Sequence, residues 1–154
     1  MDRNKIFVAT DFGKGSLTES GYPRIVKVWT RGTDLSKAKT VREATVKDMA
    51  AFGATHVTSD GSVSMVSTWE TFYTTTSSVY ENGKTLPVPA PKSAKLIGVF
   101  KGHFIYELRK PWTVGTKKMG EGSVVALNSK VVRSNTVTEN DVTEIFKQTA
   151  KSSV

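Results

Sequence analysis

The sequence predicts an all-β protein. Val, Thr and Ser are abundant, and short segments alternate between apolar and polar positions, which favours strands with one buried face. Clusters of Gly, Asn, Asp and Pro separate these segments at short intervals. Strands that recur in this way, about ten of them and without a long helical period, are typical of a sandwich, a barrel or a propeller.

The first third of the chain combines strong strand signals with one long polar loop. A Gly- and Ser-rich loop separates a short apolar run from a strand that Pro23 introduces. The expected elements are a strand over 6–9, a loop over 11–21, a strand over 24–30, a turn over 31–34 and a strand over 38–43.

The middle of the chain contains one ambiguous stretch and one clear hairpin. Residues 44–53 suit a short helix, or an irregular strand followed by a loop. Asn82-Gly83 between strand-like runs is the strongest short hairpin signal in the sequence. Strands are expected over 56–58, 63–69, 72–80 and 85–88.

The last third again predicts short strands joined by tight turns. Lys101-Gly102 marks a second tight turn, and the stretch through Gly122 is rich in glycine. Residues 142–148 fit either a strand or a helix, because Val142, Ile145 and Phe146 are helically spaced. Strands are expected over 95–100, 103–108 and 123–127.

The three tryptophans are expected to fill the space between sheets. Trp29, Trp69 and Trp112 each fall on or beside a predicted strand. Tryptophan supplies the largest apolar area of any side chain, so we expect all three to be largely buried.

The composition fits a globular protein and limits its chemistry. The chain has 154 residues, of which 38% are hydrophobic and 23% charged. It has no cysteine, which excludes disulfides, thiolate metal sites and a cysteine nucleophile. No apolar run is long enough to span a bilayer or to form a signal peptide, so no membrane partner is expected and the cytoplasm is the default location.

The formal net charge of +8 raises the question of nucleic-acid binding. The basic residues are scattered along the chain, and the densest pair, Lys117-Lys118, lies among glycines that predict a turn. Scattered basic residues on solvated turns do not form the continuous basic surface that such binding needs. We therefore expect no nucleic-acid partner.

No residue pattern predicts catalysis. Nucleophilic hydrolysis needs a nucleophile, a base and an orienting acid, and the chain offers only His56 and His103 as histidine bases. No Gly-x-Ser-x-Gly sequence occurs. Gly13-Lys14-Gly15-Ser16 differs from a phosphate-binding loop in the order of its residues, and a strand rather than a helix follows it. We expect no catalytic residue in this chain.

Metal and cofactor sites are not predicted either. The two histidines have no ligand spacing, and no pair of acids stands out. The Thr138–Asp141 stretch is acidic, but it lacks the alternating oxygen ligands and the glycine of a calcium-binding loop. We interpret it as a solvated turn.

Several motifs together resemble one protein family. Residues 10–27 (TDFGKGSLTESGYPRIVK) are distinctive, and 31–41 (RGTDLSKAKTV) continue the pattern after Trp29. Residues 107–115 (ELRKPWTVG) and 122–126 (GSVVA) add a later strand, turn and strand. In these segments the sequence resembles the β-propeller domain of prolyl oligopeptidase family serine peptidases, whereas residues 44–91 match only in pattern.

The resemblance implies a partial β-propeller of two to three blades, each a four-stranded antiparallel sheet. The blade pieces would fall at about 5–43, 44–91 and 92–149 of a single β-rich domain. The catalytic Ser, Asp and His of the family belong to a separate α/β-hydrolase domain, and no position here matches them. A whole propeller is longer, so we expect a truncated gene product or a fragment of a longer protein.

The resemblance also implies a role for the first motif as a structural or interdomain loop. We expect this loop to be ordered, with Tyr22 packed on the sheet and Arg24 paired with an acid or a carbonyl on an adjacent blade. The loop residues carried over from the family are Asp11, Gly13, Gly15, Ser20, Tyr22, Pro23 and Arg24.

In the family the propeller covers the active site and restricts access to short peptides, so the resemblance implies a gating role without chemistry. The implied partners are the hydrolase domain or the remaining blades, and an incomplete propeller is expected to self-associate through its uncovered sheets. Two other hypotheses remain open. One is a stand-alone β-domain that binds a protein partner, and the other is a basic nucleic-acid-binding module.

Overall fold

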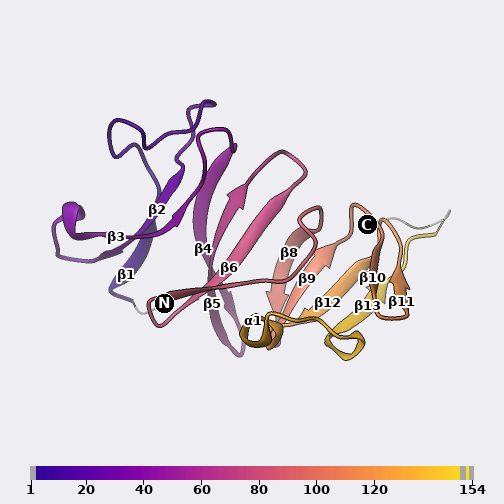
Figure 1. Ribbon diagram of the computed structural model, residues 1–154. Helices are drawn as coiled ribbons and strands as arrows, with labels where there is room; N and C mark the ends of the chain where they lie inside the picture. The colour runs from indigo at the N-terminus through magenta and orange to yellow at the C-terminus, as the bar shows by residue number, and fades with distance from the viewer. Residues whose placement is uncertain (1–2, 150–151, 153–154) are drawn as a thin grey trace. The chain divides into compact units, whose positions relative to one another are not determined.

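The computed structural model describes residues 3–149 and 152, and these form two compact units. The first unit is Met1–Val57 with Ser62–Pro87, and the second is Thr58–Gly61 with Val88–Val154. Strands dominate both units, as Figure 1 shows. Within the described part of the chain, no helix is long and apolar enough to cross a membrane.

The first sheet of the first unit has three antiparallel strands in chain order, β1-β2-β3. They are β1 (Lys5–Val8), β2 (Ile25–Thr30) and β3 (Lys39–Glu43). A 3-10 turn, η1 (Leu35–Lys37), joins β2 to β3, and the Asp34 side chain accepts a hydrogen bond from the Ser36 amide at its start. The sheet therefore uses all of the strand signals in the first third of the sequence.

The second sheet has four antiparallel strands, again in chain order, β4-β5-β6-β7. They are β4 (Ala50–Thr58), β5 (Gly61–Trp69), β6 (Thr75–Glu81) and β7 (Lys84–Pro87). Asn82 and Gly83 both have positive φ, at 51° and 80°, in the turn between β6 and β7. That backbone is the type I′ hairpin turn that Asn-Gly favours. The ambiguous stretch before β4 forms a turn and then the start of the strand, with no helix.

Small side chains hold the two sheets of the first unit together. Val26, Ala44, Ala51 and Val66 form a buried cluster, and Phe7 packs against it. A Cβ atom at Gly53 of β4 would lie 2.5 Å from the Phe7 ring, so only glycine permits this approach. The Phe7 ring also meets Tyr80 of β6 edge to face, with the ring centroids 5.7 Å apart. Phe7 of β1 is thus held between two strands of the next sheet.

A partly buried arginine makes polar contacts between the same two sheets. Arg42 of β3 donates from Nε to the Thr68 hydroxyl at 2.8 Å, and from its guanidinium to the Thr76 hydroxyl at 2.5 Å. Burial lowers the pKa of Arg42, because it removes water from the guanidinium, and the nearby carboxylates of Glu70 and Asp48 oppose that shift. These hydrogen bonds fix one register between the sheets, since a shift would leave the cation without acceptors.

The second unit contains another four-stranded antiparallel sheet, in the order β13-β12-β9-β8. Its strands are β8 (Lys95–Phe100), β9 (His103–Glu107), β12 (Val124–Asn128) and β13 (Val142–Phe146). A hairpin, β10 (Trp112–Val114) with β11 (Lys117–Met119), is inserted between β9 and β12. Two short helical turns, α1 (Val131–Ser134) and η2 (Glu139–Asp141), lie between β12 and β13. The stretch that fitted either a helix or a strand is therefore the strand β13.

The all-β prediction is confirmed, and the sheets are those of a partial propeller. In each sheet the main strands follow chain order in an antiparallel meander, as propeller blades do. The first sheet has three strands rather than the four expected. The division into blade pieces at 5–43, 44–91 and 92–149 of one domain stays a prediction.

The expected deep burial of the tryptophans is wrong, although all three lie on strands. Trp69 ends β5 and is 46% exposed, and Trp29 and Trp112 are half-buried. The buried positions of β5 are instead Ser64, Ser67 and Thr68 beside Met65 and Val66.

We expect Gly53→Ala to destabilise the first unit, because the added methyl group collides with the Phe7 ring. Overpacking of this kind costs about 1–3 kcal/mol of unfolding free energy. Gly98→Ala is the matched control, since no atom lies within 4 Å of the added Cβ. It should change stability by less than about 0.5 kcal/mol. Urea unfolding followed by circular dichroism measures both, and equal stability of the two variants would contradict the packing of Phe7 on β4.

Candidate functional site

The loop predicted as a structural or interdomain element is ordered around a carboxylate. Asp11 Oδ1 accepts hydrogen bonds from the Gly13 amide and the Ser16 hydroxyl, both at 2.8 Å. The Ser16 hydroxyl in turn accepts from the Phe12 amide at 2.8 Å, and Ser16 is buried. Gly13 and Gly15 have positive φ, at 102° and 81°, which non-glycine residues rarely adopt. The segment is therefore a compact turn that closes on its own side chains.

The Gly-Lys-Gly-Ser sequence uses the groups of a phosphate loop for internal hydrogen bonds. A phosphate loop directs backbone amides and a hydroxyl toward an anionic ligand. Here the Gly13 amide and the Ser16 hydroxyl already bind the Asp11 carboxylate. Those two hydrogen bonds, the amide first, lower the pKa of Asp11, which therefore stays charged at neutral pH.

The second half of the loop is attached to the turn before β4. The Thr18 hydroxyl donates to the Met49 carbonyl at 3.1 Å, and the Glu19 amide donates to the Val46 carbonyl at 2.8 Å. Thr18 also exchanges hydrogen bonds with Tyr22, from its amide to the Tyr22 carbonyl and from the Tyr22 amide to its hydroxyl. The loop is thus held by the segment that connects the first sheet to the second.

Arg24 closes the base of the loop. Its Nε donates to the Gly15 carbonyl at 2.6 Å, and one terminal nitrogen donates to Glu43 Oε1 at 2.7 Å and to the Ala44 carbonyl at 2.9 Å. Glu43 ends β3, which pairs with β2 in the same sheet. The prediction that Arg24 pairs with an acid holds, but the acid lies on the adjacent strand and not on an adjacent blade.

The remaining residues of the predicted loop have simpler positions. Pro23 forms an isolated bridge with Leu17, and β2 begins two residues later at Ile25. Ser20 and Gly21 lie in the exposed turn. Tyr22 is 56% exposed, so the expected packing of its ring on the sheet is wrong. The backbone of Tyr22 is held by its hydrogen bonds with Thr18. Whether the loop has an interdomain role stays a prediction.

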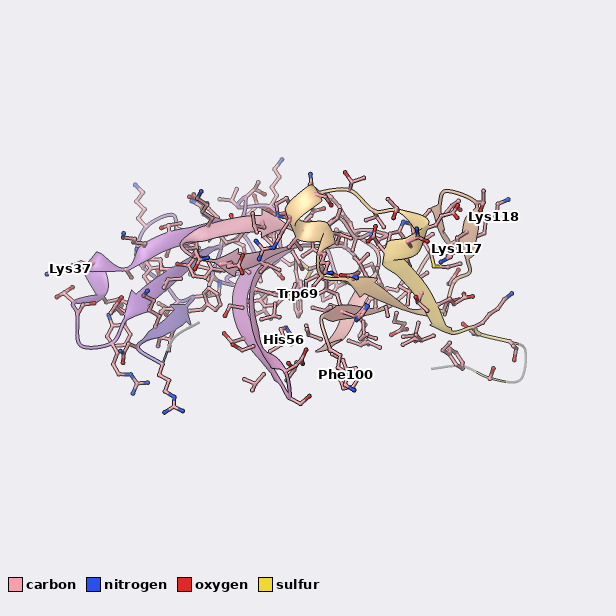
Figure 2. All side chains as sticks on the ribbon, turned by 90° about the horizontal axis from the view of Figure 1, so that it is seen from below. Lys37, His56, Trp69, Phe100, Lys117 and Lys118 are labelled. Atoms are coloured by element: carbon pink, nitrogen blue, oxygen red, sulfur yellow. The ribbon has the colours of Figure 1, made fainter. Side chains whose placement is uncertain are left out.

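Each histidine lies in a strand of a different unit. His56 is on β4 of the first unit (Figure 2), and His103 opens β9 of the second unit. The His103 ring nitrogen Nδ1 lies 2.8 Å from the Lys101 carbonyl, a local contact across the tight turn. In the described residues no group of three or more His, Cys, Asp or Glu side chains is placed to hold a metal ion.

The acidic stretch before β13 accepts hydrogen bonds within its own turn and from the turn of the β10–β11 hairpin. Asp141 accepts hydrogen bonds from the Thr138 hydroxyl and amide, and Glu139 accepts one from the Thr116 amide. These bonds lower the pKa of both carboxyl groups. Lys117 donates from Nζ to the Glu139 and Val142 carbonyls, at 2.7 Å each. Of the basic pair on the β10–β11 hairpin (Figure 2), Lys117 is thus committed to a structural contact.

Sequence reasoning missed an exposed aromatic surface at the turn between β5 and β6. We define this aromatic turn as Trp69, Phe72 and Tyr73, which are 46%, 77% and 71% exposed. Phe52 of β4 supports the Trp69 ring edge to face, with centroids 5.1 Å apart. The Thr71 and Thr74 side chains hydrogen-bond each other across the turn at 2.7 Å. The sequence signal for this surface was the presence of three aromatic residues among the five positions 69–73, next to several Thr residues.

Comparison with known proteins connects these sheets to peptidases. No protein-family model matches the sequence. An uncharacterized peptidase from Sinorhizobium fredii is 29% identical over 137 residues, which cover 84% of this chain and 19% of the relative. An uncharacterized peptidase from Rickettsia prowazekii is 29% identical over 122 residues, covering 75% of this chain and 17% of that protein.

A solved structure agrees with the sequence relatives. The post-proline cleaving enzyme from Rickettsia typhi superimposes with a TM-score of 0.83 and 25% identity, over 97% of this chain and 22% of that one. The chain therefore spans about a fifth of the length of the proteins that it matches. These similarities support a propeller domain of a prolyl oligopeptidase-like peptidase.

We expect Arg24→Ala to loosen the loop over residues 11–23, because it removes three hydrogen bonds from the base of that loop. Hydrogen bonds to a charged group contribute about 1.5–3 kcal/mol, so the loss should lie in that range or above. Glu43→Gln is the control, since it removes only the exposed ion pair and should cost less than about 1 kcal/mol. Amide hydrogen exchange of Ser16 and Thr18 reports the loosening. Unchanged exchange in Arg24→Ala would contradict the proposed closure.

We expect the order of the loop to depend on acidic pH through Asp11. The folded-state pKa is lower than the ordinary value of 3.8, so the carboxylate stabilises the loop above that value. The stabilisation should be lost as the pH falls through the lowered pKa. In Asp11→Asn the same exchange measurement should show a looser loop at neutral pH, and the difference from wild type should shrink below about pH 4. A difference that stays constant with pH would rule out the carboxylate as the cause.

Proposed function

We propose that this chain, which belongs to the propeller domain of a prolyl oligopeptidase-like peptidase, contributes no catalytic group and limits which peptides reach an active site on another domain. The match to a post-proline cleaving enzyme along 97% of the chain supports the proposal most directly. Because the chain covers only 22% of that enzyme, most of the enzyme lies outside the matched segment.

The side chains of the described residues support a scaffold rather than an active centre. Asp11 and Ser16 are hydrogen-bonded to each other, and Glu43 is paired with Arg24. Asp141 accepts the Thr138 amide of its own turn, and Glu139 accepts the Thr116 amide of the β10–β11 turn. A general base or nucleophile needs a lone pair directed at substrate. The contacts of these carboxylates are those of groups that stabilise turns and strand ends.

The packing of the first unit suits a size filter. Its sheets approach so closely that Gly53 is required, and the partly buried Arg42 fixes their register. Close-packed sheets resist deformation. An opening bounded by such sheets would keep a fixed width, and it would admit only peptides narrow enough to pass. Short peptides would pass such an opening more readily than folded or long chains.

A chimeric enzyme tests this proposal. The segment of the Rickettsia typhi enzyme that matches this chain is replaced by these 154 residues. We expect kcat/KM for a short peptide with an internal proline to remain within about tenfold of the parent enzyme, because on this proposal the exchanged segment provides no group that touches substrate. Cleavage of an unfolded polypeptide of domain length should stay absent.

The isolated 154-residue chain is the matched control, and we expect it to have no peptidase activity. Turnover by the isolated chain that survives repurification would refute the non-catalytic role. Efficient cleavage of the long polypeptide by the chimera, with the short-peptide activity retained, would refute the size filter.

The aromatic turn favours a second candidate function, a β-domain that binds a protein partner. Exposed Trp and Tyr side chains are enriched at such interfaces, and Trp69, Phe72 and Tyr73 are all substantially exposed. Phe72→Ser with Tyr73→Ser separates the two candidates. If the turn has no role in the size filter, the double variant should leave the peptidase activity of the chimera unchanged. If the turn is a docking surface, the double variant should no longer bind the protein partner.

A further inference from the structure

The β10–β11 hairpin is a separate small sheet within the second unit (Figure 1). Among the described strands, β10 and β11 pair only with each other. The pairing of β9 with β12 ends just before the hairpin, where the Leu108 amide donates to the Ser123 carbonyl at 2.8 Å and the Gly122 amide donates to the Leu108 carbonyl at 2.7 Å. A two-stranded hairpin is marginally stable alone, so contacts with the rest of the unit must hold it in place.

One face of the hairpin is directed toward the interior of the unit. The register places Val114 opposite Lys117, with Met119 on the same face two residues further along. Val114 and Met119 are 7% and 2% exposed, whereas the residues of the other face, Thr113 and Lys118, are exposed. We call Val114, Lys117 and Met119 the inner face of the hairpin.

Two polar contacts join the tip of the hairpin to the segment that leads into β13. The Thr116 amide in the turn donates to the Glu139 side chain. In the other direction, Lys117 donates from Nζ to the Glu139 and Val142 carbonyls, at 2.7 Å each. We call the side chains of Glu139 and Lys117 the latch, because each reaches from its own segment to the backbone of the other.

The turn at the tip is built to admit the latch. Gly115 has a φ of 57° at the first position of a two-residue turn, a place where hairpins favour glycine. A Cβ atom at Gly115 would collide with the Glu139 side chain. The last residue of the distinctive segment 107–115 is therefore required twice, by the backbone of the turn and by the carboxylate that packs on it.

The base of the hairpin contains the residue types of a hinge. Pro111 directly precedes β10, and Gly120 and Gly122 follow β11. Hinges are a few loop positions that absorb changes of backbone angle, and small residues are common among them. The regular pairing of the main sheet resumes beyond these positions, at Ser123.

We propose that the β10–β11 hairpin is a flap that opens as a unit while the main sheet stays folded, and that Glu139 and Lys117 hold it closed. The hairpin has its own strand pairing, a glycine-containing base and a side-chain latch at its tip, so it can separate without breaking the pairing of β9 with β12. Opening exposes Val114 and Met119 of the inner face. This device requires no peptidase activity and goes beyond the proposed function.

Oxidation of two equally buried methionines tests the flap in the whole chain. Met119 on the inner face and Met65 on β5 of the first unit are each 2% exposed. Hydrogen peroxide transfers one oxygen atom to the thioether sulfur and leaves water, and mass spectrometry of the peptides measures the sulfoxide at each position. We expect Met119 to be oxidised at least about tenfold faster than Met65, because local opening exposes it. Equal rates would overturn the flap.

Substitution of the latch tests what keeps the flap closed. Glu139→Ala removes the acceptor of the Thr116 amide, and Lys117→Leu removes the donor to the two carbonyls. Each variant should oxidise at Met119 at least about threefold faster than the wild type, as expected for the loss of hydrogen bonds. The rate at Met65 should not change. Wild-type rates at Met119 in both variants would overturn the latch.

Matched variants separate the latch from a general loss of stability. Glu139→Gln keeps an oxygen that can accept the Thr116 amide, so its rate at Met119 should lie between those of the wild type and Glu139→Ala. Asp141→Asn changes the other acid of the same turn, which accepts hydrogen bonds from Thr138, and should leave the rate at Met119 unchanged. Amide hydrogen exchange of β9 should stay slow in all variants. If the latch variants speed exchange of β9 as much as oxidation of Met119, the whole unit opens and the flap is refuted.

Discussion

The close approach of β1 to β4 is the constraint on which the first unit depends. Phe7 lies over Gly53, and no other residue type at position 53 leaves room for the ring. This approach brings the cluster around Val26 and Val66 together and places Arg42 within reach of Thr68 and Thr76. The cation loses water on burial, so the two hydroxyls and the nearby acids must compensate in one particular arrangement. Apolar packing sets the distance between the sheets, and the arginine sets their alignment.

The long loop is a consequence of the same arrangement. Thr18 and Glu19 donate hydrogen bonds to carbonyl groups of the turn at residues 46–49, which leads directly into β4. Arg24 joins the other side of the loop to Glu43 and Ala44, at the end of β3. The loop therefore follows the connection between the two sheets, and the hydrogen bonds of Asp11, Ser16, Thr18 and Arg24 give those residues a structural role. A scaffold of this kind presents surfaces of fixed shape, which is what exclusion by size requires.

The sequence was most informative where a local backbone requirement selects the residue. Asn82-Gly83 has the positive φ values of a hairpin turn, and Asp11 accepts the hydrogen bond two residues ahead that Asp favours in turns. The strand signals alone were compatible with a sandwich, a barrel or a propeller. The resemblance to the propeller family selected the propeller.

The errors concern the placement of individual side chains rather than of strands. Trp69 was expected in the core by its size, but it is exposed, and Ser64, Ser67 and Thr68 are among the buried residues of its strand. Tyr22 was expected on the sheet, but its side chain is exposed while its backbone bonds to Thr18. Arg24 found its acid on the adjacent strand, because the β2–β3 register places Glu43 opposite Ile25. Gly53 gave no signal in the sequence, since its importance comes only from a ring that lies 46 residues away in the chain (53 − 7).

The fold of the first unit depends on face-to-face stacking of its two sheets. Nuclear Overhauser effects between the Phe7 ring and the Gly53 α-protons measure this contact directly in solution. We expect strong effects from Phe7 to Gly53, weaker effects from Phe7 to the Tyr80 ring, and effects between the Arg42 Nε proton and Thr68. If both sheets show the cross-strand effects of folded sheets but none between Phe7 and Gly53, the sheets do not stack and the propeller assignment of this unit is wrong.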